Sequence, residues 1–195
     1  MKLKFIMLVG TLVLTLSTFA QEKYSLSYII GIPSGPTADF TPSTSFRGVG
    51  FDFTYMLSKE LGIGASVGLQ TFYDDLGKQT ITDGTETTTA TRYHYINSLP
   101  VYATASYFFN NSNNVTPFVS LGIGLMYNQI DEEIGVYTLE DDAWQFSMRP
   151  EIGLEYTINY GVSLRAAGRY NYAAKSGDVD GLSHFGIALG VTWSN

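Results

Sequence analysis

The sequence contains no cysteine, little charge and, after its first twenty residues, no apolar run long enough for a membrane-spanning helix. Without cysteine there are no disulfides, so stability must come from a packed or membrane-embedded framework. Only 15% of the residues are charged, which is low for the surface of a soluble domain. Any membrane span must therefore be built from strands, because only helices and closed barrels satisfy the backbone in lipid.

The first twenty residues resemble a secretory signal peptide. Two lysines precede an apolar run from Phe5 to Leu16, and small residues follow up to Ala20. The run is shorter than the roughly 20 apolar residues of a spanning helix. We expect residues 1–20 to be a signal peptide cleaved after Ala20, leaving residues 21–195 as one barrel domain.

Acidic residues outnumber basic ones by 18 to 11, and the net charge is −7 at pH 7. Loss of the first segment would remove two lysines and make the chain more negative. This charge excludes nucleic acid as a partner, since its phosphates require a basic surface. No motif predicts a cofactor. The stretch GIGASVG at 62–68 superficially suggests a phosphate loop, but it lies within an expected strand with no helix after it.

Eight segments are apolar at every second position, which is the strand period. Their connections are alternately short and long, as in an even-numbered barrel with short turns on one side of a membrane. The sequence therefore predicts an all-β fold, an eight-stranded antiparallel up-and-down transmembrane β-barrel. The expected strands are 23–32, 46–57, 61–73, 91–109, 118–128, 144–156, 161–172 and 183–193, with short connections at 58–60, 110–116 and 157–160 and long ones at 33–45, 74–90, 129–143 and 173–182.

The chemistry of the two strand faces indicates which one meets lipid. A soluble lipid-carrying barrel would turn its bulky face inward and expose Lys and Glu. Here the second face is mostly Gly, Ser, Ala and Thr, as in 62–68, which suits the narrow interior of eight strands. The bulky face should then contact hydrocarbon, with aromatic girdles at both interfaces. The expected girdle residues are Tyr55, Tyr107, Phe109, Phe118, Tyr156 and Trp193 near the short turns, and Tyr73, Tyr93, Tyr127, Trp144, Tyr170 and Tyr172 near the long loops.

The segments SFRGVGFDFTYML, YINSLPVYATASYFF, TPFVSLGIGLMY and FGIALGVTW resemble a known family. They are similar to the small outer-membrane β-barrel proteins of Gram-negative bacteria, the OmpA/OmpX-like group and its short Bacteroidetes forms. The resemblance implies an outer-membrane location and contact with membrane lipid and lipopolysaccharide. It also implies no catalytic motif, and we expect a monomer.

Six charged residues fall on the inward face by strand parity. A short connection pairing Thr157 with Gly161 would set Glu151 opposite Ala167 and diagonal to two arginines. Buried charges must be paired or they are costly. The cluster is interpreted as a structural plug, with a gated or narrow conduction path as the alternative. Its members are Asp52, Arg149, Glu151, Glu155, Arg165 and Arg169.

Two further patterns could carry chemistry. A lipid A-modifying barrel enzyme would use a histidine with a serine and an acid at the membrane rim; the histidines are His94 and His184, and Ser183 is adjacent to the second. Adjacent strand residues point to opposite faces, which argues against pairing. The acidic connections at 129–143 and 173–182 could bind Ca²⁺ or Mg²⁺ weakly, or could simply be solvated.

We therefore expect a non-enzymatic outer-membrane protein with a filled lumen. Its role would be structural, or interaction with an extracellular ligand or host surface through acidic extracellular loops. The alternatives are a narrow channel for small or apolar solutes and the lipid A-modifying enzyme.

Overall fold

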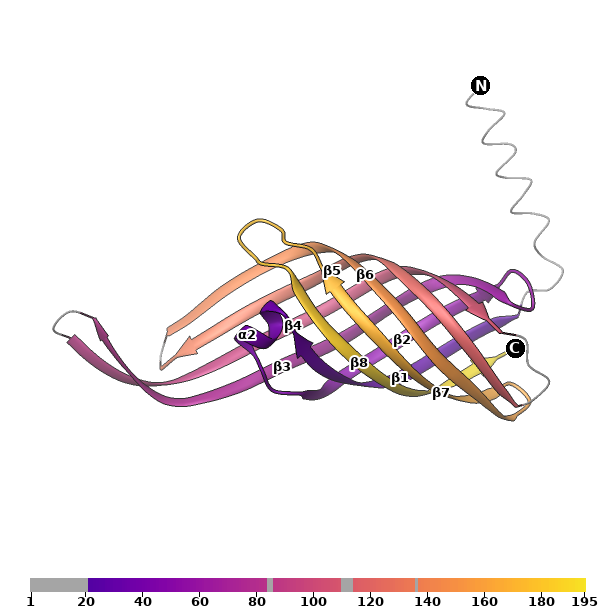
Figure 1. Ribbon diagram of the computed structural model, residues 1–195, viewed down its shortest axis with the longest axis horizontal. Coiled ribbons are helices and arrows are strands. Elements are labelled where there is room, and N and C mark those ends of the chain that lie inside the picture. The colour runs from indigo at the N-terminus through magenta and orange to yellow at the C-terminus, as the bar shows by residue number, and fades with distance from the viewer. Residues whose placement is uncertain (1–20, 84–85, 110–113, 136) are drawn as a thin grey trace, which may run out of the picture.

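The computed structural model describes residues 21–83, 86–109, 114–135 and 137–195, so the expected signal peptide lies outside the described residues. Eight antiparallel strands follow one another around a closed barrel, in which β1 also pairs with β8 (Figure 1). The predicted fold class is confirmed. The strands are β1 (Glu22–Ser34), β2 (Ser45–Met56), β3 (Leu61–Asp83), β4 (Glu86–Phe108), β5 (Val115–Ile134), β6 (Tyr137–Asn159), β7 (Val162–Ala173) and β8 (Leu182–Ser194).

Two of the predicted long loops are strands, and their prediction as loops was wrong. The ladder of β3 and β4 continues to the pair Asp83 and Glu86, and that of β5 and β6 to Ile134 and Tyr137. These parts of the strands extend beyond the barrel wall. In the sequence these segments are mostly polar, so the apolar alternation disappears while the backbone pairing continues.

At the end of the barrel with the long connections, strands β2 and β7 stop before their neighbours β3 and β6 do. The ladder of β2 with β3 stops at Gly48 and Gln70, and the ladder of β7 with β6 stops at Ala173 and Ser147. Four strands therefore extend beyond the barrel as the long arm visible in Figure 1. We call residues 71–83, 86–97, 129–134 and 137–142 the protruding sheet.

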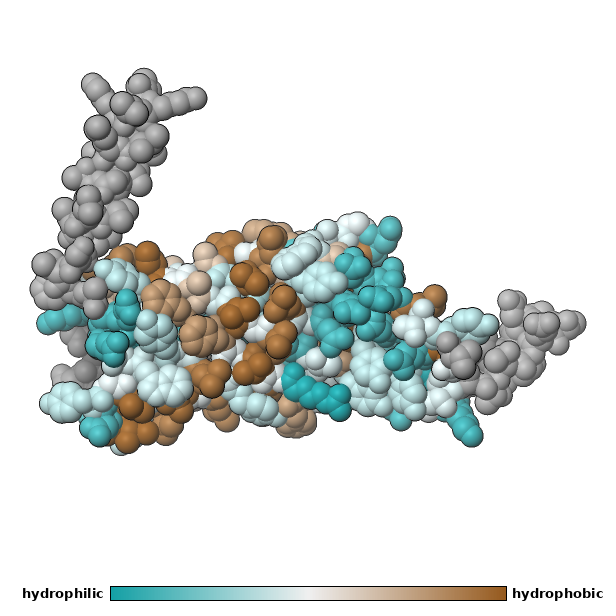
Figure 2. Space-filling model, turned by 180° about the vertical axis from the view of Figure 1, so that it is seen from behind, coloured by the Kyte–Doolittle hydropathy of each residue, from teal (hydrophilic) through white to brown (hydrophobic). Residues whose placement is uncertain are grey.

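The outer wall of the barrel is apolar. Alternate residues of each strand point outward, and large aliphatic side chains such as Ile152 and Leu189 are at least half exposed. On the face shown in Figure 2, hydrophobic residues form a belt across the barrel, with hydrophilic residues toward both ends. A belt of this kind matches the hydrocarbon core of a bilayer. No helix in the described part of the chain is long and apolar enough to cross a membrane.

Most expected girdle residues lie on the outer wall at the strand ends. Phe118 is the exception, because its side chain is fully buried inside the barrel. Phe118 is adjacent to Val119, which points outward, and adjacent strand residues point to opposite faces. The sequence therefore already indicated that Phe118 lies in the lumen. The expected girdle residues whose side chains are partly or largely exposed at the ends of the barrel wall are Tyr55, Tyr107, Phe109, Tyr127, Trp144, Tyr156, Tyr170, Tyr172 and Trp193.

The lumen is filled by side chains of very different sizes. A Cβ on Gly122 would approach the Tyr102 side chain to 3.2 Å, so the absent side chain leaves room for the tyrosine. Bulky residues close the lumen at two levels. Met56, Phe108 and Phe118 pack in the half with the short turns, and the larger group toward the long connections is Phe72, Ile96, Tyr102, Met126, Ala173 and Leu182.

A short helix that the sequence did not predict, α2 (Pro36–Phe40), lies in the first long connection (Figure 1). Gly35, at φ +54°, turns the chain before Pro36, whose fixed φ suits the first turn of a helix. The hydroxyl of Thr37 accepts a hydrogen bond of 2.9 Å from the Ser183 backbone N–H. Phe40 stacks on the ring of His94 with 3.9 Å between centroids. These contacts hold α2 across the mouth of the barrel.

The turn between β6 and β7 differs from the prediction. Asn159 pairs with Val162, and the ladder has an irregularity between Thr157 and Asn159. Gly161 adopts φ +77°, which glycine does without steric cost. The predicted pairing of Thr157 with Gly161, and of Glu151 with Ala167, was therefore wrong by two residues.

Candidate functional site

Ion pairs fill the lumen from the short-turn end upward. Glu155 lies directly opposite Arg165, whose Nη1 donates a 3.2 Å hydrogen bond to Glu155 Oε1. The other carboxylate oxygen accepts a 2.8 Å hydrogen bond from Lys23 Nζ. Lys23 was absent from the predicted cluster, although it alternates with outward-facing Tyr24 and its parity placed it inside.

Glu151 occupies the centre of this network. It lies directly opposite Arg169, with 3.1 Å between Arg169 Nη2 and Glu151 Oε2, and it accepts a 2.6 Å hydrogen bond from Arg165 Nη2. Arg149 extends the network, since its Nη2 donates to Asp52 Oδ1 at 2.9 Å. The carboxylates of Asp52 and Glu151 thus each contact more than one arginine. The structure brings all six predicted cluster residues together.

Aromatic rings accompany the cations. Among the described residues, the four cations Lys23, Arg149, Arg165 and Arg169 form ion pairs only with the three carboxylates of Asp52, Glu151 and Glu155, so the cluster holds one more positive than negative charge. Arg165 lies 4.2 Å from the centroid of the Phe118 ring, and Arg149 and Lys23 lie over two other rings. A ring face attracts a desolvated cation. The rings and ion pairs together compensate the cost of burying these charges.

A layer of neutral polar side chains lies above the ion pairs. Asn128 Nδ2 donates to Gln145 Oε1 at 2.5 Å, and Tyr102 is hydrogen-bonded to Ser147 at 2.8 Å. Gln145 Nε2 also donates to the Asp180 carbonyl at 2.8 Å, which draws the 174–181 connection into the mouth. From the short-turn end, the lumen therefore carries ion pairs, then a polar layer, and then two covering segments, α2 and residues 174–181.

The candidate enzyme residues are not arranged for nucleophilic catalysis. His94 Nδ1 is hydrogen-bonded to the Phe40 carbonyl at 2.7 Å. The Ser183 hydroxyl donates to the Ser34 carbonyl at 3.0 Å, and no described histidine bonds to it. His184 is buried against the edge of the Phe72 ring. A serine activated by a histidine needs a direct hydrogen bond between them.

The outward face of the protruding sheet has an aromatic half and an acidic half. Tyr73, Tyr95, Asp131 and Glu140 lie in one cross-strand row over β3, β4, β5 and β6. The Tyr73 ring lies 5.0 Å from the Tyr95 ring between centroids. The aromatic half therefore belongs to β3 and β4, and the acidic half to β5 and β6.

The acidic half holds like charges beside one another. Asp131 and Glu140 are direct cross-strand partners, and Gln129 Nε2 donates to both, at 3.3 and 2.9 Å. Among the described residues, neither these two nor Glu133 and Asp142 form an ion pair with a basic side chain. No group of three or more carboxylates or histidines in the described residues is arranged to hold a metal ion.

An apolar outer belt around a polar, side-chain-filled lumen is the architecture of an outer-membrane protein. A family model described as an outer membrane protein beta-barrel domain matches residues 6–194. The chain belongs to this family. The outer-membrane β-barrel domain places it in the outer membrane of a Gram-negative bacterium.

Solved structures of similar barrels agree in fold. Ail of Yersinia pestis, solved with the heparin analogue sucrose octasulfate, matches with a TM-score of 0.57 and 13% identity over 90% of this chain and 99% of that one. Neisserial surface protein A matches with a TM-score of 0.56 and 16% identity, over 89% of this chain and 96% of that one. OprG of Pseudomonas aeruginosa matches with a TM-score of 0.55 and 14% identity, over 90% of this chain and 96% of that one. A search of curated proteins finds no match. At these identities the likeness shows the outer-membrane barrel fold alone.

Proposed function

We propose that this outer-membrane barrel is a non-enzymatic, non-conducting protein that presents its protruding sheet to a partner outside the cell. The observation that carries the proposal is the acidic half of that sheet, where Asp131, Glu133, Glu140 and Asp142 form no ion pair with a basic side chain of the described residues. Like charges directly opposite one another destabilise a pair of strands. A partner with a basic surface would relieve that repulsion, and opposite charge would also speed its encounter with the sheet.

The filled lumen supports the same function. The ion pairs, the polar layer and the two covering segments leave the barrel as a rigid support for the sheet. Because β1 pairs with β8, the barrel is closed and needs no strand from a second copy. We therefore propose that a monomer is the working unit.

Polyanions are disfavoured as partners of the protruding sheet. Ail was solved with a sulfated sugar, and the two barrels share a fold at 13% identity. A sulfated ligand on the protruding sheet of this chain would lie beside Asp131, Glu133, Glu140 and Asp142. Repulsion between these groups and a sulfated ligand favours a cationic partner instead.

Binding of model peptides tests the proposal. The full mature chain, in phosphatidylcholine nanodiscs, is titrated with a peptide of alternating lysine and glycine, and with the same peptide carrying glutamate. We expect the lysine peptide to bind, with an affinity that falls as salt is added. The double variant Asp131→Asn with Glu140→Gln should bind it severalfold more weakly. Asp178→Asn is the matched control on another exposed connection.

Two results would refute the proposal. One is equal binding of both peptides, or no loss in the double variant. The other is steady conductance of the unmodified protein in planar bilayers, which would favour the narrow channel.

A further inference from the structure

A β-bulge in β2 turns two consecutive side chains outward at the rim of the barrel near the long connections. Ile29 pairs with Gly48 and Gly31 with Ser45, so Phe46 and Arg47 together oppose a single residue of β1. Both are exposed, Phe46 to 61%. A bulge is a common device for redirecting side chains at the rim of a barrel.

Ser45 fixes this bulge. Its hydroxyl donates to the Thr71 carbonyl, and it accepts hydrogen bonds from the Arg47 backbone N–H at 3.1 Å and from Gln70 Nε2 at 2.8 Å. Ser45 is itself buried. The direction of the Phe46 and Arg47 side chains is thus set by a buried network beneath them.

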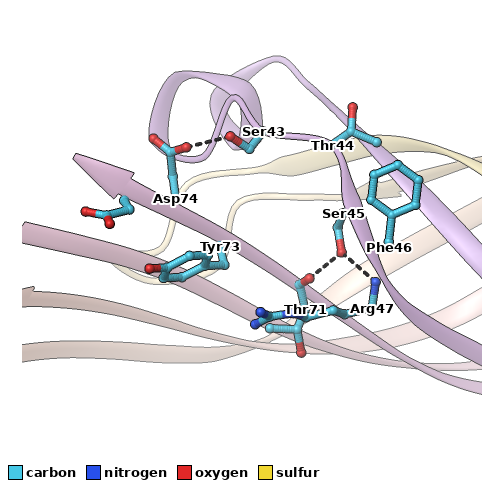
Figure 3. A pocket seen from close by; sticks show the side chains of 9 residues that line it. Ser43, Thr44, Ser45, Phe46, Arg47, Thr71, Tyr73 and Asp74 are labelled. Carbon is cyan, nitrogen blue, oxygen red and sulfur yellow. Dashed lines mark hydrogen bonds between the residues drawn. The ribbon is translucent and has the colours of Figure 1, made fainter. Parts of the chain in front are cut away.

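A cavity of about 490 Å³ opens beside the bulge, where β2 and β3 separate above their last pair (Figure 3). Phe46 and Tyr73 stand on opposite sides of it, and Ser45 and Thr71 lie between them. The Ser43 hydroxyl donates to Asp74 Oδ1 at 2.6 Å, which ties the segment before β2 to β3. A cavity of this size falls in the range of small-ligand sites.

The lining combines donors, acceptors and ring faces. The Arg47 guanidinium lies over the Tyr73 ring at 5.4 Å, and among the described residues no carboxylate forms an ion pair with it. Asp74 and Asp75 supply acceptors, and the Thr44 hydroxyl supplies both a donor and an acceptor. The proposed function rests on the acidic half of the protruding sheet, on β5 and β6, whereas this cavity is lined by β2, β3 and the segment before β2.

We propose that this cavity binds a neutral sugar ring of the hexose class. Each sugar hydroxyl both donates and accepts, so it can satisfy the carboxylates and the guanidinium at once. The apolar C–H face of a sugar can pack on the exposed Phe46 ring, whose face carries partial negative charge. The negative charges of Asp74 and Asp75, beside the single positive charge of Arg47, disfavour binding of a phosphate or sulfate group. A purely apolar ligand is also disfavoured, because it would bury the hydroxyls and charged groups of the cavity without hydrogen bonds.

The experiment measures sugar binding to the full mature chain. Protein in nanodiscs made only of phosphatidylcholine is examined by saturation-transfer NMR with the methyl glycosides of glucose, galactose, mannose and N-acetylglucosamine. Glucose 6-phosphate and inorganic phosphate are the anionic probes. We expect saturation transfer to at least one neutral glycoside, and at least fivefold less in Phe46→Ala and in Arg47→Gln. Phe185→Ala, an exposed aromatic outside the cavity, should bind like the unmodified protein.

Three results would overturn the proposal. They are binding of none of the glycosides, binding of the phosphate probes in preference to all of them, and undiminished glycoside binding in both cavity variants. A folded barrel in each variant is verified first by its gel mobility with and without heating.

A second arm identifies the source of the sugar. The measurement is repeated in nanodiscs that contain lipopolysaccharide with a full core saccharide, or lipid A alone. If the bound glycoside is displaced only by the core-bearing form, the sugar belongs to a glycolipid of the same membrane. If neither form displaces it, the sugar comes from a glycan outside the cell.

Discussion

Arg165 Nη2 donates a 2.6 Å hydrogen bond to Glu151 Oε1 inside the barrel, between neighbouring strands β6 and β7. Both side chains are almost completely buried. Glu151 also contacts Arg169 and Arg149, so its carboxylate is the anion on which three cations converge. Removal of that charge should be felt by the whole network.

Glu151→Gln should lower the free energy of unfolding by about 3–5 kcal/mol, because it leaves buried arginines without their main counter-charge. The heat-induced shift of the folded barrel on a gel should then occur at a lower temperature. Arg165→Gln in the same chain should restore part of the loss, since the two residues share one network. A double variant that loses the sum of both single losses would show that they are uncoupled.

Leu189→Arg should destabilise the barrel by about 2–4 kcal/mol, because it places a cation in the apolar belt. Leu139→Arg is the matched control, as Leu139 is 61% exposed in the protruding sheet and Leu189 is 50% exposed in the belt. Folding yields in lipid vesicles report the difference. Similar yields for both variants would contradict lipid contact at Leu189.

The two ends of the barrel should face different compartments. The chain has no cysteine, so a single introduced one is unique. Tyr137→Cys, in the protruding sheet, should react with an impermeant maleimide on intact cells, whereas Lys59→Cys in a short turn should react only after lysis. The reverse pattern would invert the orientation. Mass spectrometry of the same samples should find Gln21 as the first residue if the signal peptide is cleaved as predicted.

Replacement of α2 by a flexible segment should leave the barrel closed to ions. Substituting residues 36–40 with Gly and Ser removes the Phe40 stack on His94 and the Thr37 bond to Ser183. The ion-pair network below would still fill the lumen, so planar-bilayer recordings should stay at the baseline. Steady conductance in this variant would identify α2 as the seal and the network as permeable.

The period-two pattern was sufficient to predict the barrel, its strand order and its lipid-facing side, because burial in lipid requires strict alternation. The same pattern could not predict the protruding sheet. In that sheet Asp131 and Glu140 are paired across β5 and β6 just as Leu121 and Leu154 are paired within the barrel, but the sequence around them has no apolar alternation.

The alternation of side chains along each strand predicted which residues lie in the lumen, but it did not predict which of them contact one another. Alternation placed Glu151 and Arg165 inside, but their register depended on a turn whose geometry is set by Gly161 and one irregular position. The cavity beside Phe46 and Arg47 arises from the bulge in β2. That bulge depends on hydrogen bonds of Ser45 to β3, which are distant in sequence.

Closure of the ladder between β1 and β8 has a consequence for assembly. Tyr24 pairs with Trp193, so the first strand cannot be completed until almost the whole chain has crossed to its site of folding. Contacts so distant in sequence form late and slowly. Until then both strands present open edges that could pair with other chains. Productive assembly therefore depends on keeping these two edges apart from other strands until they meet, and the final step in forming the barrel is also the step that removes its risk of aggregation.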